Sequence, residues 1–194
     1  MTLNVGVYLF AEVELLDFAG PCEVFTTANR LAPEGAPFSL FSVAASHEPV
    51  RSRAGVVIQP DYEFKDHPPV DVLLVPGGVV DAVIDEAAVL CWIAGVSANA
   101  RLTASICNGA FLLAAAGLLD GRLVTTHWED VDALRTGFPR LEVEDGPRWV
   151  DQGDVVTSAG VSAGIDMSLH LVERLHSRTL AAATARQMDF HRAS

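Results

Sequence analysis

The sequence is poor in cysteine, with only Cys22, Cys91 and Cys107 among its 194 residues. Three cysteines that lie so far apart exclude a disulfide framework. No pair has the CxxC spacing, and no cluster of cysteine and histidine is typical of a zinc site. We therefore expect no metal and no cofactor.

Positive charge is also scarce, because 13 lysines and arginines stand against 25 aspartates and glutamates. A formal net charge of -12 is opposite to the basic surface that binds nucleic acid or anionic lipid. The N-terminus has no basic region before an apolar stretch, and no apolar run approaches the roughly 20 residues of a membrane span. We expect no nucleic-acid or membrane partner, and a cytoplasmic location.

The composition, 50% hydrophobic and 20% charged, is that of an ordinary globular protein, and the length suits one domain over residues 1–194. Apolar runs predict strands at 5–10, 38–44, 70–75, 101–106, 123–126, 149–150 and 154–157. Helices are predicted at 21–29, 87–98, 108–116, 129–136, 162–175 and from 179, with a loop at 12–20 and a hairpin or an edge strand at 50–59. This alternation predicts an α/β domain with a mostly parallel sheet, whose ligands bind beyond the carboxyl ends of the strands.

Cys107 lies between an apolar run and a helix-favouring stretch, in the segment Ala104-Ser105-Ile106-Cys107-Asn108-Gly109-Ala110. This pattern indicates a strand that ends in a tight turn and leads directly into a helix. A thiol at that turn faces the helix N-terminus, so we expect a lowered pKa and a nucleophilic sulfur. The alternative is a buried structural cysteine. Cys22 and Cys91 are interpreted as helix-packing residues.

Asp17 is a carboxylate among apolar neighbours, directly after the first predicted strand. Beside a thiolate, its pKa would be raised by burial and by like charge. It could then donate a hydrogen bond to the sulfur of Cys107 or transfer a proton. The alternative is a helix N-cap.

Two glycines, Gly77 and Gly78, follow Pro76 at the end of the neighbouring predicted strand. Glycine leaves backbone N–H groups unobstructed. Together with the N–H of Asn108, they predict an oxyanion hole. The alternative is a plain turn.

His127 and Thr126 follow another predicted strand. His127 is a candidate for orienting substrate or transferring a proton, although a lone histidine is more often structural. Thr126 is expected to form a hydrogen bond within the pocket. Trp128 and Trp149 are interpreted as packing residues.

The small residues of 158–164, which include Gly160 and Val161, precede the last long predicted helix. We expect them either to line the pocket or to let the helix approach the sheet closely.

These segments together resemble the ThiJ/PfpI superfamily, single-domain relatives of the class I glutamine amidotransferases. The matching segments are 16–21 (LDFAGP), 75–78 (VPGG), 105–109 (SICNG), 125–128 (TTHW) and 157–166 (TSAGVSAGID). The resemblance implies a flavodoxin-like three-layer α/β/α sandwich with a mostly parallel central sheet, a nucleophile elbow and a homodimer. The most similar branch contains isonitrile hydratases and the sensor domains of AraC-type regulators.

The hydratase resemblance implies that Cys107 attacks the terminal carbon of a small isonitrile substrate. Water then hydrolyses the thioimidate to an N-formamide, with Asp17 as the acid and base. Asn108 stands where the hydratases usually carry Thr and where protease-like members carry His. Nothing at 158–166 supplies the late histidine of the glutaminases.

Other functions remain open on the sequence alone. The same cysteine could hydrate an aldehyde, in a glyoxalase-like reaction. The chain could instead be a non-catalytic sensor that binds a metabolite or registers oxidation of the thiol.

Overall fold

The computed structural model describes residues 2–192, which form a seven-stranded central sheet in the order β10-β11-β7-β6-β1-β2-β5. Neighbouring strands are parallel except for the antiparallel pair of β10 and β11. The strands are β1 (Leu3–Tyr8), β2 (Phe38–Ala44), β5 (Tyr62–Glu63), β6 (Val72–Val75), β7 (Leu102–Ile106), β10 (Trp149–Asp151) and β11 (Val155–Ser158).

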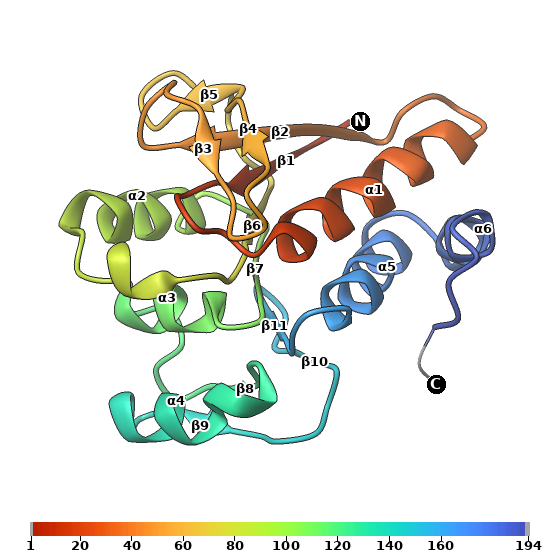
Figure 1. Cartoon of the computed structure of the whole chain (residues 1–194). Coiled ribbons are helices and arrows are strands. Elements are labelled where there is room, and N and C mark those ends of the chain that lie inside the picture. Colours follow the sequence, from red (N-terminus) through yellow and green to blue (C-terminus); the bar gives the residue numbers. More distant parts are fainter. Residues whose placement is uncertain (1, 193–194) are drawn as a thin grey trace.

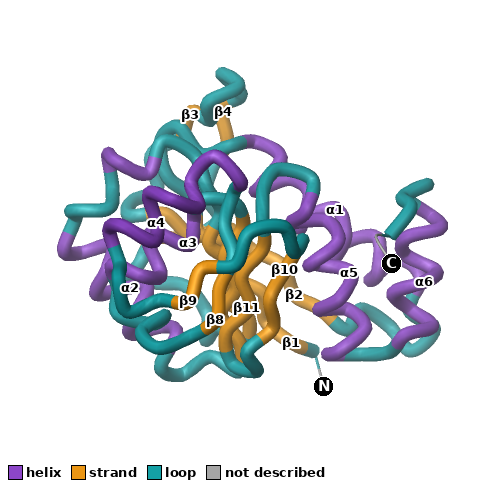
Figure 2. Tube along the Cα trace, turned by 90° about the horizontal axis from the view of Figure 1, so that it is seen from below, coloured by secondary structure: helices purple, strands orange, loops and turns teal. Residues whose placement is uncertain are grey.

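Helices cover both faces of this sheet (Figures 1 and 2). One layer holds α1 (Leu15–Leu31), α5 (Ala163–Leu175) and α6 (Arg178–Gln187). The other holds α2 (Ala87–Ser97), α3 (Gly109–Ala115) and α4 (Val131–Gly137), with the 3₁₀ turns η1 (Val80–Ala82) and η2 (Trp128–Asp130). The predicted three-layer α/β/α sandwich is therefore confirmed. No helix within residues 2–192 has the length and apolar character needed to cross a bilayer.

The central strands are apolar on both faces because each face packs against helices. In β6, Val72 and Leu74 belong to the core beneath α1 and α5, whereas Leu73 and Val75 belong to the core beneath α2 and α3. Successive side chains of a strand point to opposite faces, so both sets are buried. This explains why the strand reads as a continuous hydrophobic run.

The predicted loop at 12–20 is wrong, because α1 begins at Leu15 and carries Pro21 in its interior. Proline cannot donate to the carbonyl four residues earlier and weakens the helix there. The buried side of α1, which includes Gly20 and Pro21, packs against α5, where a Cβ at Gly20 would lie 3.1 Å from Ile165. Tertiary packing therefore outweighs the local effect of proline and places Asp17 in the first turn.

Two short sheets lie outside the central one. The predicted hairpin is confirmed as the antiparallel pair β3 (Val50–Arg51) and β4 (Val57–Ile58). The predicted strand at 123–126 is only β8 (Leu123–Val124), and it pairs with β9 (Glu142–Val143). The segment that carries His127 therefore extends from this small sheet.

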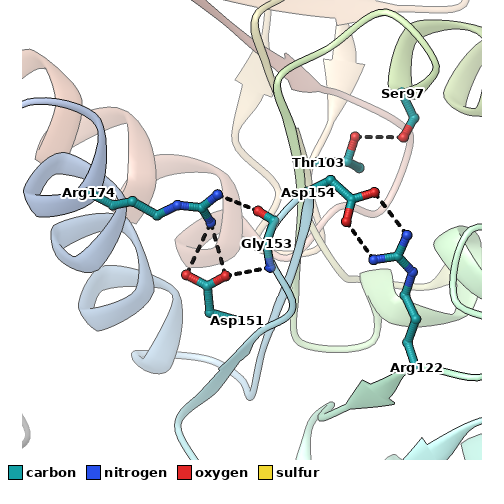
Figure 3. Close-up of polar contacts among 7 residues, drawn as sticks. All are labelled: Ser97, Thr103, Arg122, Asp151, Gly153, Asp154 and Arg174. Carbon is teal, nitrogen blue, oxygen red and sulfur yellow. Dashed lines mark hydrogen bonds and ion pairs between the residues drawn. The ribbon is translucent and has the colours of Figure 1, made fainter.

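A polar network fixes the end of the sheet opposite Cys107 (Figure 3). Asp151 accepts hydrogen bonds from Arg174 at 3.0 Å, from the Gly153 N–H at 2.8 Å and from His170 at 2.7 Å. Nearby, Arg122 donates to both carboxylate oxygens of Asp154 at 2.7 and 2.9 Å. These contacts join the β10–β11 turn to α5 and to the segment before β8.

We predict that Asp151→Asn lowers the free energy of unfolding at pH 7 by about 1–2 kcal/mol. Although partial burial alone raises the pKa of Asp151, the hydrogen bonds from His170 and Gly153 and the charge of Arg174 lower it below the usual 3.8. A carboxyl whose pKa is lower in the folded than in the unfolded protein stabilises the fold at pH values above its unfolded-state pKa. That contribution is lost as the pH falls through its folded-state pKa. Urea unfolding at pH 7 and below about pH 3 checks this.

The matched control is Asp132→Asn, because that side chain is 95% exposed and pairs only across the surface with Arg135. The difference between wild type and Asp151→Asn should shrink on acidification, whereas Asp132→Asn should change little at either pH. Equal effects of the two substitutions would contradict the assignment.

Candidate active site

Cys107 follows β7 directly and adopts a left-handed backbone conformation with φ of 56°. Its N–H donates to the Ser158 carbonyl at 3.1 Å, and its own carbonyl accepts from Thr126 Oγ1 at 3.0 Å. The turn is so tight that it requires glycine at position 109, because a Cβ there would collide with the Val75 carbonyl. Thr126 therefore holds the backbone of the elbow, a more specific contact than the predicted bond within the pocket.

Asp17 is fully buried beside this elbow. Its Oδ2 accepts from the Gly77 N–H at 3.2 Å, and its buried Oδ1 has no hydrogen-bond partner. Burial raises the pKa of Asp17 to about 7, with a further contribution from Glu14, while hydrogen bonds with Cys107 and Gly77 oppose the rise. The N-cap of α1 is Glu14, so the capping alternative for Asp17 is wrong.

The expected lowering of the Cys107 pKa is wrong for this structure. The side chain is only 8% exposed, and burial is the main cause that raises its pKa, followed by the charge of Asp17. Asp130 raises it further, whereas a hydrogen bond from the Asn108 N–H lowers it. Loss of solvation and two carboxylates thus outweigh the donor at the start of α3.

The two glycines after β6 donate to side chains. The Gly77 N–H donates to Asp17, and the Gly78 N–H donates to Asn108 Oδ1 at 2.8 Å. In return, Asn108 Nδ2 donates to the Gly78 carbonyl at 3.0 Å. The two glycine N–H groups predicted for an oxyanion hole are therefore already engaged, and the Asn108 side chain joins the elbow to the turn after β6.

A small polar cavity of about 180 Å³ opens over Cys107. It is smaller than the roughly 300–1,000 Å³ of pockets for drug-sized ligands. Its lining residues are Glu14, Arg53, Gly78, Cys107, Asn108, His127, Glu129, Asp130 and Val161. Five of these were sequence candidates. Of the other candidates, Gly160 lies against the sulfur, since a Cβ there would collide with Cys107 Sγ.

Sequence reasoning missed the charged residues of the cavity. Arg53 comes from the β3–β4 hairpin, where its N–H donates to the Val13 carbonyl at 3.0 Å and its guanidinium lies 3.6 Å from Glu14. No local pattern places a hairpin over a site formed mainly by distant segments. Glu129 and Asp130 lie 3.8 and 3.9 Å from the ring of His127, and their positions two and three residues after that histidine are a usable signal.

Two packing interpretations also need correction. Trp128 is 70% exposed, and its ring centroid lies 5.7 Å from that of His127. Cys91 is exposed on α2, whereas Cys22 packs against the core beneath α1 as predicted. Trp149 packs as predicted, stacked on His170 with ring centroids 5.4 Å apart.

Within the described part of the chain, no group of three or more His, Cys, Asp or Glu is arranged to hold a metal ion.

We predict that Gly160→Ala slows alkylation of Cys107 by iodoacetamide about tenfold or more. The added methyl group would overlap the sulfur and lie 2.8 Å from His127 Cδ2. Gly95→Ala is the matched control, because nothing lies within 4 Å of a Cβ at that position of α2. Site-resolved mass spectrometry measures both rates, and an unchanged rate at Cys107 in Gly160→Ala would refute the close approach.

Comparison with known proteins places these observations in context. A model of the DJ-1/PfpI family matches residues 4–174. An isonitrile hydratase of Pseudomonas putida is 34% identical over 191 residues, which cover 98% of this chain and 79% of that protein. The transcriptional regulator GbdR of Pseudomonas aeruginosa is 29% identical over 97% of this chain, which spans only 51% of the regulator.

A solved structure of the same family is also similar to this chain. A ThiJ/PfpI family protein from Pseudomonas syringae has a TM-score of 0.89 and 30% identity, covering 100% of this chain and 77% of that one. The family model and the hydratase alignment both extend over most of the sequence, including Asp17 and Cys107. This chain therefore belongs to the DJ-1/PfpI family.

Proposed function

We propose that this protein is a cysteine-dependent hydratase that adds water to a small electrophilic carbon, with an isonitrile as the substrate. One observation carries the proposal: a fully buried carboxyl, with a pKa of about 7, lies beside a thiol on a nucleophile elbow. An acid and base with a pKa near the working pH is suited to proton transfer in both directions. The 34% identity to an isonitrile hydratase supports the choice of substrate.

The reaction proceeds in two balanced steps. As Cys107 Sγ attacks the terminal carbon of R–N≡C, Asp17 accepts the thiol proton and returns it to that carbon, which gives the thioimidate R–N=CH–S–Cys. Asp17 then removes a proton from water as the oxygen adds to the same carbon, and the nitrogen gains a proton. Collapse of this adduct releases R–NH–CHO and restores the thiol. The sum is addition of one water with no redox change.

The surroundings of the cavity support a small head group on an apolar substituent. The volume of about 180 Å³ suits a compact head group at Cys107. Val79 and Trp128 directly follow the lining residues Gly78 and His127, and they are 39% and 70% exposed. In this proposal His127, Asn108, Gly78 and Val161 contact the substrate, while Gly77, Thr126 and Gly160 position the elbow.

A second candidate function is a metabolite sensor, favoured by the similarity to GbdR over 97% of this chain. A sensor of this kind would bind the small molecule at Cys107 without turnover. Redox sensing receives less support, because burial and Asp17 raise the pKa of the thiol, and oxidation proceeds through the thiolate. The homodimer and the cytoplasmic location expected from the sequence remain predictions about this chain.

We predict that the purified protein converts an aryl isonitrile to its N-formamide, detected by chromatography. Cys107→Ser should reduce this activity to the uncatalysed rate. Asp17→Asn should lower kcat by about 10²–10⁴-fold, the usual contribution of general acid–base catalysis. Cys91→Ser is the matched control, because that exposed cysteine on α2 lies outside the cavity lining, and it should retain full activity.

The outcomes separate the two functions. No formamide above the Cys107→Ser background would contradict the hydratase proposal. If the protein then bound the isonitrile unchanged, with an affinity that Cys107→Ser abolished, the sensor function would be supported instead.

A further inference from the structure

The walls of the Cys107 cavity carry an uneven set of charges. Three carboxylates, from Glu14, Glu129 and Asp130, line it together with a single guanidinium, that of Arg53. Arg53 lies 3.6 Å from Glu14 and so partly neutralises one of the three. Glu129 and Asp130 lie next to His127, at 3.8 and 3.9 Å from its ring. The lining is therefore acidic overall.

This negative potential reaches the reacting atom. The charges of Asp17 and Asp130 both raise the pKa of Cys107, in addition to burial. Asp130 is itself affected: partial burial raises its pKa first, the charge of His127 lowers it, and the charges of Glu129 and Asp81 raise it further, with a net rise. Carboxylates that disfavour each other's ionisation define a region where another negative charge is unfavourable.

An independent feature shows that the buried side of the site also has acceptor capacity left over. Asp17 Oδ1 is buried and has no hydrogen-bond partner, although the carboxyl lies beside Cys107. A buried oxygen without a partner is unfavourable until a donor reaches it. A group that carries an N–H or O–H donor can meet this requirement, whereas an anionic oxygen cannot and would be repelled by the carboxylate.

We propose that the Cys107 cavity selects its substrate by charge: it admits neutral and cationic electrophiles and rejects anionic ones. The inference rests on the proposed function in one respect, that the substrate reaches Cys107 through this cavity. It narrows the substrate class to isonitriles, or related small electrophiles, without a carboxylate, phosphate or sulfonate group.

Two methanethiosulfonate reagents of similar size test the proposal without any turnover. One carries a trimethylammonium group and the other a sulfonate group. Each transfers its thioalkyl group to the cysteine, forms a mixed disulfide and releases methanesulfinate, so the chemistry at sulfur is the same. The rate at Cys107 is followed by site-resolved mass spectrometry. Cys91, which is exposed on α2, serves as the internal reference for reagent reactivity and for the net charge of -12.

At each cysteine we compare the modification rate by the cationic reagent with the rate by the anionic one. We expect this cation-to-anion rate ratio to be about tenfold or more higher at Cys107 than at Cys91. Glu129→Gln and Asp130→Asn should each reduce this excess about threefold, and Arg53→Gln should increase it. Asp132→Asn is the matched control, because its side chain is 95% exposed and does not line the cavity. It removes the same unit of charge and should leave the ratio unchanged.

Equal cation-to-anion ratios at Cys107 and Cys91 would overturn the proposal. An effect of Asp132→Asn as large as that of Asp130→Asn would also overturn it, because the net charge would then explain the selectivity. The result is distinguishable from failure of the hydratase proposal: charge selection without formamide refutes the reaction alone. Formamide production without charge selection refutes this inference alone.

Discussion

Asp17 and Cys107 are two acidic groups buried against each other, and ionising both at once is unfavourable. Burial raises the pKa of each; the charge of Asp17 raises the pKa of Cys107 further, whereas a hydrogen bond with Cys107 lowers that of Asp17. The pair therefore behaves as a unit that holds at least one proton near neutral pH. Burial gives this carboxyl a pKa of about 7, and burial together with the charge of Asp17 keeps the thiol protonated until a substrate arrives.

Much of the surrounding structure keeps this pair in contact. The left-handed conformation of Cys107 turns its side chain out of the sheet, and Asn108 ties the elbow to the turn after β6. Gly77 lets that turn approach, because a Cβ there would lie 2.9 Å from Asp17 Oδ2. Gly160 leaves room for the sulfur in the same way. The parallel sheet brings these separate segments together at the carboxyl ends of its strands.

The sequence predicts the sheet, the elbow and the acidic partner, because each depends on local patterns. Strands buried on both faces read as apolar runs, and a carboxylate among apolar residues marks Asp17 as unusual. The start of α1 was misplaced because packing against α5 outweighs Pro21. Arg53 was missed because only the fold brings its hairpin over the cavity. The pKa of Cys107 was misjudged because burial depends on tertiary structure.

The most direct test of the coupled pair is a titration of the Cys107 thiolate by its ultraviolet absorbance. The signal is isolated as the difference between wild type and Cys107→Ser, and then measured again in the Asp17→Asn background. The account predicts that Cys107 ionises above the ordinary thiol value of about 8.5, and that its pKa falls in Asp17→Asn. A pKa below the ordinary value in the wild type, or no change in Asp17→Asn, would contradict it.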